Sequence, residues 1–194
     1  MAAVPAIRAV VGLGNPGAEY AKTRHNVGFM VIDELASRGN LSLRSKFSGR
    51  FGRLNPDQHD LLVLAPQTWM NLSGDSVQPM CAFFRVPPAE LLVVHDDIDL
   101  PFGELRIKIG GGHAGHNGLR SIVARLASAD FVRVRVGVGR PDDATVRDHV
   151  LTAFRGDESA ALDQVIDAAV KAVWLIVSKG GRAAMNEVNG QRVV

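Results

Sequence analysis

The sequence contains a single cysteine, Cys81, among its 194 residues. It therefore cannot form an internal disulfide, which favours a reducing compartment and a cytoplasmic protein. The opening residues, MAAVPAIRAVV, lack a charged region followed by a long apolar run, so neither a signal peptide nor a membrane span is expected. Internal repeats and low-complexity segments are also absent, and the length predicts one domain or two small ones.

Several catalytic motifs are missing as well. No GxSxG sequence is present, and Cys81 lies within an apolar helical stripe, where it fills a core rather than acting as a nucleophile. Covalent acyl transfer therefore has no candidate nucleophile. The glycine-rich loop at 110–118 contains neither GxxxxGK[ST] nor GxGxxG in proper register, so its signal for a nucleotide-binding fold is weak. A metal-dependent hydrolase stays open, although HExxH and paired CxxC spacings are absent among its possible ligands, His95, Asp96, Asp97, Asp99, His113 and His116.

Lysine is scarce, since only five of the 22 basic residues are lysines and the net charge is only +2. The basic residues gather in the middle of the chain, where seven of them lie between Arg106 and Arg140 beside a single acid, Asp130. Arginine forks match phosphate geometry, so this stretch predicts a nucleic-acid contact. The alternative is an ordinary solvated face.

The spacing of apolar residues predicts an α/β fold. Short apolar or alternating runs predict strands at 7–13, 47–54, 61–65, 90–95, 105–109 and 131–137. The second and third of these are expected to pair antiparallel through Asn55, Pro56 and Asp57. Helical spacing begins near Val27, Val77, Leu119 and Glu158, and a short helix and a loose tail are expected after Gly181.

The segment 104–126 predicts a strand, a glycine-rich loop and a helix. Five glycines occupy the nine positions from Gly110 to Gly118, and Asn117 takes the expected N-cap position. Two histidines accompany them in a loop that needs neither for turning. Polar side chains at the carboxyl end of a strand are typical of sites in open α/β sheets. The alternative is simply a tight strand-to-helix turn.

Two further residues indicate acid–base chemistry. His25 precedes the predicted helix, and a helix N-terminus disfavours imidazolium, which would keep the ring neutral and able to accept a proton. Asp96 follows a buried strand and could lie near His25 or near the loop histidines. A histidine base, an orienting carboxylate and asparagine amides that hold an oxyanion favour hydrolysis of a reactive ester.

Residues 66–74 predict a binding surface before the second helix. Asn71 and Ser73 compete for the N-cap of that helix. If Ser73 takes the cap, Asn71 is free to face a site, beside Trp69 and Met70. Asn15 similarly follows the first strand, although asparagine before proline is also common in plain turns.

Four segments resemble the signature blocks of bacterial-type peptidyl-tRNA hydrolases in sequence, order and spacing, namely VVGLGNPGAEYAKTRHNVGF, TWMNLSG, VVHDDIDLPFG and GGGHAGHNGLRSI. The likeness runs from about Ile7 to Gly139. It implies a single-domain α/β fold over residues 1–194, with a twisted mixed β-sheet flanked by helices. It also implies hydrolysis of the ester between a peptide and the 3′ end of tRNA by a cytoplasmic monomer that uses neither metal nor organic cofactor.

The resemblance also implies roles for individual residues. His25 would be the catalytic base and Asp96 its orienting carboxylate. The substrate's peptide and acceptor end would be bound by Asn15, Asn71 and Asn117, in a cleft formed by Tyr20, Trp69, Met70 and His116. The family often carries phenylalanine or tyrosine at the position of Trp69. The tRNA would be contacted by Arg106, Lys108, Arg133 and Arg135, with residues 140–150 as a lid. A non-catalytic RNA-binding relative stays open as an alternative, although such a protein would tend to lose His25 or Asp96.

Overall fold

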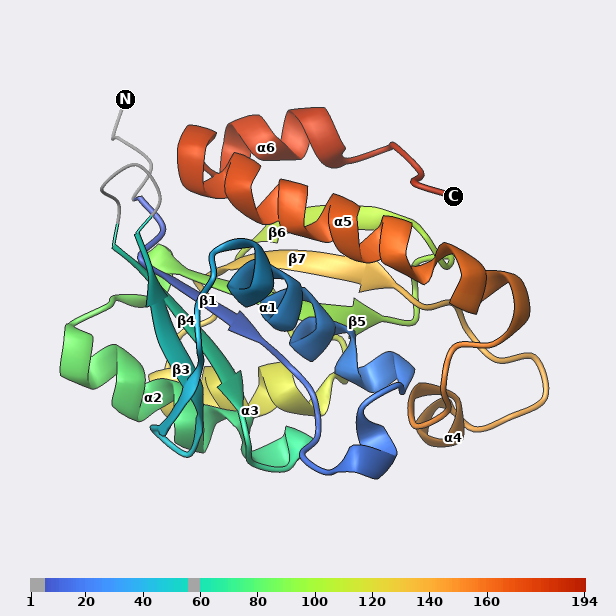
Figure 1. The fold of residues 1–194 in the computed structure, drawn as a ribbon, viewed down its shortest axis with the longest axis horizontal. Helices are drawn as coiled ribbons and strands as arrows, with labels where there is room; N and C mark the ends of the chain where they lie inside the picture. The colour runs from blue at the N-terminus through green and yellow to red at the C-terminus, as the bar shows by residue number, and fades with distance from the viewer. Residues whose placement is uncertain (1–5, 56–59) are drawn as a thin grey trace.

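The structure, a computed structural model, describes residues 6–55 and 60–194 (Figure 1). In this part of the chain seven strands form one sheet in the order β2-β3-β4-β1-β5-β7-β6. Its strands are both parallel and antiparallel, and helices cover both faces, which confirms the predicted α/β architecture. The strands are β1 (Ala9–Gly12), β2 (Arg44–Lys46), β3 (Gly49–Leu54), β4 (Leu61–Pro66), β5 (Leu91–Asp97), β6 (Leu105–Ile109) and β7 (Val132–Gly137).

The four inner strands, β4, β1, β5 and β7, run parallel to one another. Their carboxyl ends therefore meet at one edge of the sheet. The strands on either side, β3 and β6, run antiparallel to their neighbours, and the predicted antiparallel pair of β3 and β4 is confirmed. Part of its predicted connection, Pro56 and Asp57, lies outside the described residues.

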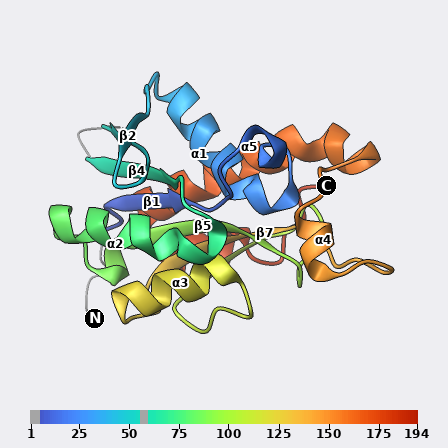
Figure 2. The same ribbon diagram turned by 90° about the horizontal axis from the view of Figure 1, so that it is seen from below.

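Two layers of helices enclose the sheet, and a short helix lies at its carboxyl edge (Figures 1 and 2). One face carries α1 (Val27–Arg38), α5 (Gly156–Lys179) and α6 (Gly181–Val188). The other carries α2 (Ser73–Phe84) and α3 (Asn117–Leu126), and the short helix is α4 (Val146–Val150). Single 3₁₀ turns are η1 (Ala18–Tyr20), η2 (Arg24–Asn26), η4 (Met70–Leu72) and η5 (Pro88–Glu90). None of the helices in the described ranges is long and apolar enough to span a bilayer.

The inner strands are buried on both faces. Successive side chains alternate between the layers, so Val10 joins the core under α1 and α5, while Val11 joins the core under α2 and α3. Burying such a side chain contributes roughly 1.5–3 kcal/mol. Cys81 belongs to the second core, and burial raises the pKa of its thiol to about 11, which confirms that it fills the core.

Two glycines bring the start of α1 against the sheet. A Cβ atom on Gly12 would lie 2.1 Å from the carbonyl oxygen of Gly28, and one on Gly28 would lie 2.3 Å from the backbone nitrogen of Leu13. Real Cβ atoms do not approach backbone this closely, so only glycine permits the contact. The close packing sets η2, and with it His25, directly beside the carboxyl edge.

Two predictions about the chain path are wrong, namely that the glycine loop leaves its strand at the carboxyl edge of the sheet and that the C-terminal tail is loose. Because β6 runs antiparallel to β7, Ile109 pairs with Val132 at the start of β7, and β6 therefore ends at the edge opposite the carboxyl ends. The glycine loop crosses back to deliver α3 to the carboxyl edge. The C-terminal tail is not loose, since Arg192 bridges Glu104 and Val193 donates a hydrogen bond to Gly103.

Candidate active site

A cleft of about 830 Å³ opens at the carboxyl edge of the sheet. Parallel strands bring their ends together here, which is where open α/β sheets bind ligands. The cleft gathers all the catalytic and substrate-binding residues expected from the sequence, namely Asn15, Tyr20, His25, Trp69, Met70, Asn71, Asp96, His116 and Asn117.

Asp96 lies at the centre of the site, at the end of β5, with 3% of its surface exposed. Its Oδ1 atom accepts a hydrogen bond from Nδ1 of His25 at 2.8 Å and another from Nε2 of His116 at 3.0 Å. A carboxylate offers no proton to a ring nitrogen, so both histidines are the donors. Residues from before α1, from β5 and from before α3 thus meet on one oxygen atom.

The His116 ring also begins α3. Its Nδ1 accepts hydrogen bonds from the backbone nitrogens of Gly118 at 3.1 Å and Leu119 at 3.3 Å. His116, rather than Asn117, is therefore the N-cap, and the predicted cap is wrong by one residue. Because Nδ1 accepts and Nε2 donates, this ring is the neutral Nε2–H tautomer.

The ionisation of His25 differs from the prediction. Burial lowers its pKa, but the charge of Asp96 and the hydrogen bond to it outweigh burial and leave the pKa above its ordinary value. The helix N-terminus therefore does not set this pKa. For a carboxyl group burial has the opposite effect and by itself would raise the pKa of Asp96, but the His25 and His116 rings hold this pKa well below the ordinary value. Asp96 is the anion of the site.

His95 forms a neutral floor beneath these residues. Its Nδ1 donates to the backbone carbonyl of Asp96 at 2.7 Å, and its ring packs edge-on against His116 with 4.9 Å between centroids. Burial lowers its pKa to about 3. The ring therefore carries no charge near neutral pH and supports its neighbours.

Asn15 is held in place by a second asparagine. The side chain of Asn26 accepts from the backbone nitrogen of Asn15 at 2.8 Å and donates to its carbonyl at 2.9 Å. The Oδ1 atom of Asn15 in turn accepts from the backbone nitrogen of Met70 at 2.8 Å. This chain links the turn after β1 to the turn after β4, and it leaves the Asn15 amide NH₂ as the donor available to a ligand.

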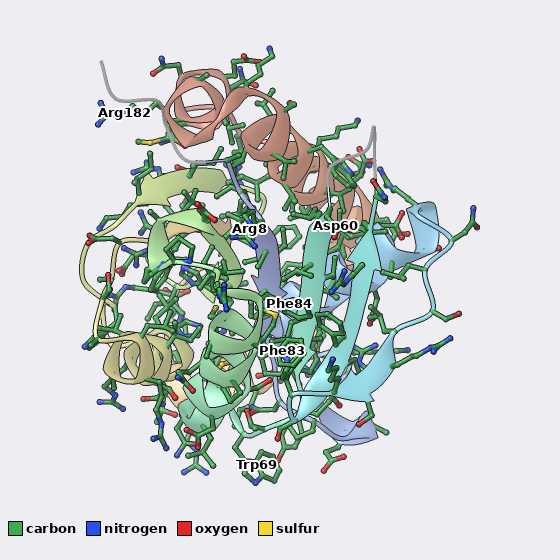
Figure 3. The ribbon with its side chains drawn as sticks, turned by 90° about the vertical axis from the view of Figure 1, so that its left-hand side faces the viewer. Arg8, Asp60, Trp69, Phe83, Phe84 and Arg182 are labelled. Carbon is green, nitrogen blue, oxygen red and sulfur yellow. The ribbon has the colours of Figure 1, made fainter. Side chains whose placement is uncertain are left out.

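The outer wall of the cleft is exposed. Trp69 is 51% exposed and projects from the lower edge of the molecule in Figure 3. Its ring meets that of Tyr20 edge-on, with 5.8 Å between centroids. Asn71 and Asn117 are also exposed, and Asn117 accepts from Arg120. Neither of the two candidates, Asn71 and Ser73, caps α2, because the N-cap position is Leu72 and Ser73 is the first helical residue, with its hydroxyl donating to the carbonyl of Met70.

The basic residues of β6 and β7 share one face of the sheet. Arg106 pairs in register with Arg135, and Lys108 with Arg133. Two of them already have acidic partners, since Arg106 binds Glu104 and Arg135 binds Asp97, each at 2.7 Å. Lys108 has no ion pair among the described residues, and Arg106 does not line the cleft.

Arg133 differs from the other three because it is buried, with 3% of its surface exposed. Its guanidinium donates to the carbonyl oxygens of Gly110, Gly111 and Gly112, the last at 2.9 Å. These three carbonyls belong to the first residues after β6, where the glycine loop begins. The side chain therefore supports the loop, and the structure gives it partners other than the phosphate that we expected.

The spacing of His25, Asp96 and His116 must also be tested against metal binding, because their ligand atoms lie within 4.8 Å of one another. A metal on His116 Nε2 would require that nitrogen to lose its proton and Nδ1 to gain one. Nδ1–H would then oppose the two backbone N–H groups that it now accepts from. The donor set therefore fits hydrogen bonding to Asp96 better than metal coordination.

Several residues of the site were not predicted from the sequence. Asn26 and Arg24 flank His25, and their hydrogen bonds to remote segments reveal their roles. An asparagine next to a candidate base is a signal that could have been used for Asn26. A further wall comes from α4, which belongs to the predicted lid segment and contributes Val146, Arg147 and Val150, and from Leu151 directly after it.

Comparisons with known proteins agree with this geometry. The family model described as peptidyl-tRNA hydrolase matches residues 9–194. The chain is 52% identical to a peptidyl-tRNA hydrolase of Sorangium cellulosum, over 93% of this chain and 82% of that protein, and 49% identical to one of Syntrophotalea carbinolica, over 95% and 98%. The crystal structure of peptidyl-tRNA hydrolase from Acinetobacter baumannii superposes with a TM-score of 0.91 at 42% identity, over 97% of both chains. On fold, site and sequence together, the chain belongs to the peptidyl-tRNA hydrolase family.

Proposed function

We propose that this chain hydrolyses the ester between a peptide and the 3′ oxygen of tRNA, with His25 as general base. The observation that carries the proposal is the His25–Asp96 hydrogen bond. It fixes the proton on Nδ1 and leaves Nε2, which has no hydrogen-bond partner among the described residues, as the basic nitrogen in the cleft.

The proposed reaction needs no covalent intermediate. His25 Nε2 takes a proton from water as the water oxygen attacks the ester carbonyl carbon. Asp96 stabilises the imidazolium that forms, and the amides of Asn15, Asn71 and Asn117 donate to the developing oxyanion. The carbon–oxygen bond to tRNA then breaks, and the imidazolium returns the proton to the leaving 3′ oxygen.

The remaining roles follow the layout of the cleft. Tyr20, Trp69 and Met70 form a wall for the peptide and the terminal adenosine, and His116 holds Asp96 in place. The basic residues of β6 and β7 lead away from this wall, so we assign the tRNA phosphates to Arg106, Lys108 and Arg135, with Arg133 acting through the glycine loop. We further propose that residues 1–194 act as one domain, as a cytoplasmic monomer and without a metal.

Substitution of the base tests the proposal. His25→Ala should lower turnover of N-blocked aminoacyl-tRNA by about 10³-fold or more, because a positioned general base contributes about 10²–10⁴-fold. Binding of uncharged tRNA should stay close to that of the unmodified protein. Lys171→Ala, on the exposed side of α5 away from the cleft, is the matched control and should leave turnover unchanged. Near-normal turnover in His25→Ala would remove His25 from this role.

A further inference from the structure

Arg24, the residue before His25, ties η2 to the segment that follows α4. Its backbone nitrogen donates to the carbonyl of Thr152 at 3.0 Å, and the neighbouring Thr23 forms a β-bridge with Ala153. Figure 1 shows α4 beside the η2 turn at the carboxyl edge. More than 120 residues separate the two segments along the chain.

The guanidinium of Arg24 makes most of the contact. Nη1 donates to the carbonyl oxygens of Thr152 at 3.2 Å and Ala153 at 3.1 Å, and at the limit of 3.5 Å to that of His149. Nη2 binds Glu158, in the first turn of α5, at 2.5 Å. The group also lies over the ring of the buried Phe154, 5.4 Å from its centre.

This arrangement uses both terminal nitrogens of the guanidinium, Nη1 and Nη2, whereas Nε is buried without a hydrogen-bond partner among the described residues. The carbonyls belong to the last turn of α4 and the residues after it, where a positive charge is favourable. The Arg24 side chain is only 11% exposed and Glu158 only 27%, so the pair is screened less than a surface ion pair. The planar fork serves several acceptors at once, which a lysine ammonium cannot reproduce.

We propose that Arg24 is a positioning residue, which sets His25 against Asp96 by clamping η2 to the α4 wall of the cleft. The proposal rests on the function assigned above to His25. Val146, Val150 and Leu151 of that wall line the cleft that His25 faces. The Arg24 side chain therefore holds both His25 and the α4 wall that a substrate touches. A substitution that frees η2 from this wall should make the positions of both less well defined.

The test is Arg24→Lys, which keeps the charge and removes the fork. We expect kcat to fall about tenfold or more, because small misplacements of a catalytic group cost up to about 10²-fold. We also expect the His25 pKa, measured by NMR titration of the ring, to fall as Asp96 moves away. Asp96 and His116, the titratable groups that face this ring, are not substituted in the variant, so a lower pKa would report a longer distance between His25 and Asp96. Arg24→Ala should show both effects more strongly.

Arg38→Ala is the matched control. Arg38 also joins α1 to α5, through Asp167 at 2.8 Å, but it lies at the far end of α1 from His25. It should leave kcat and the His25 titration unchanged. A folded Arg24→Lys with normal kcat and a normal His25 titration would overturn the proposal, even if its Tm is lower. The titration does not depend on turnover, so it decides this question even if His25→Ala shows that another residue is the base.

Discussion

The His25–Asp96–His116 group and the basic face of β6 and β7 contain similar numbers of charged or titratable residues, but they are assembled differently. The first draws on three segments far apart in the chain, and every contact converges on one carboxylate oxygen. The second comes from two paired strands, and three of its four residues already have protein partners. Because both histidines donate to one oxygen of Asp96, the contacts decide which ring nitrogens carry protons. The pairing of β6 with β7 decides only where the basic side chains lie.

The two groups differ in burial as well as in the segments that they connect. Asp96 is removed from water, so each hydrogen bond to it acts in a medium of low dielectric and shifts the balance between charged and neutral forms. Arg106 and Lys108 remain exposed, so water and salt screen their interactions. We therefore expect changes in the first group to alter rate and pH dependence, and changes in the second to alter binding and its dependence on salt.

After the loss of His25 itself, the largest effect should follow from removing the charge of Asp96. Asp96→Asn should lower kcat/KM by about 10²-fold, less than His25→Ala, because the carboxylate orients the base and stabilises its charge. The pH profile should move too. Activity requires neutral His25, so it rises as pH passes the pKa of that ring. Asp96 raises the pKa and burial lowers it, so the acid limb should shift to lower pH in the variant.

The pH profile of kcat/KM measures this shift, because it reports groups of the free enzyme. A folded Asp96→Asn enzyme whose acid limb stays in place would show that His25 is not the titrating group. Lys171→Ala is again the control variant and should leave the pH profile unchanged. His113→Ala is unsuitable as a control because His113 lines the cleft.

An intermediate effect should separate Lys108 from Arg133. Lys108→Ala should weaken binding of all tRNAs alike and flatten the plot of log affinity against log salt by about one unit, because one phosphate contact is lost. Arg133→Ala should instead lower Tm, because three carbonyl oxygens lose their donor, and should change the salt slope little. A flattened salt slope in Arg133→Ala together with a lowered Tm in Lys108→Ala would reverse the two assignments.

A small-substrate assay sharpens this comparison. An ester that carries only the terminal adenosine does not extend to the basic strands, so Lys108→Ala should hydrolyse it normally. Lys108 lines the same cleft as His25, so loss of activity on that ester would show that it acts on the reacting end of the substrate rather than on the tRNA phosphates.

The smallest effect, no change at all, is expected from chelation. EDTA should leave turnover of N-blocked aminoacyl-tRNA unaltered, because both histidine nitrogens nearest Asp96 carry protons and cannot hold a metal. Activity that disappears in EDTA and returns with zinc or manganese would support metal coordination by His25, Asp96 and His116.

Much of this arrangement was predictable. Alternation and apolar runs predict the strands, because a buried strand must present apolar residues to one or both faces. The motif segments place Asn15, His25, Asp96 and His116 correctly at one cleft, because each follows or precedes an element that ends at the carboxyl edge. The direction of β6 was not predictable, since a strand bearing alternating residues has the same pattern in either orientation.

The sequence by itself determined the elements, the family and the residue types at the site, since these depend on local spacing and on short contiguous motifs. Only the tertiary structure decided which nitrogen of each histidine carries the proton, that Asp96 raises the pKa of His25, and that Arg133 supports a loop. Protonation and partner choice depend on burial and on distances between segments remote in the chain. Arg24 and His149 are 125 residues apart, and folding alone brings them together.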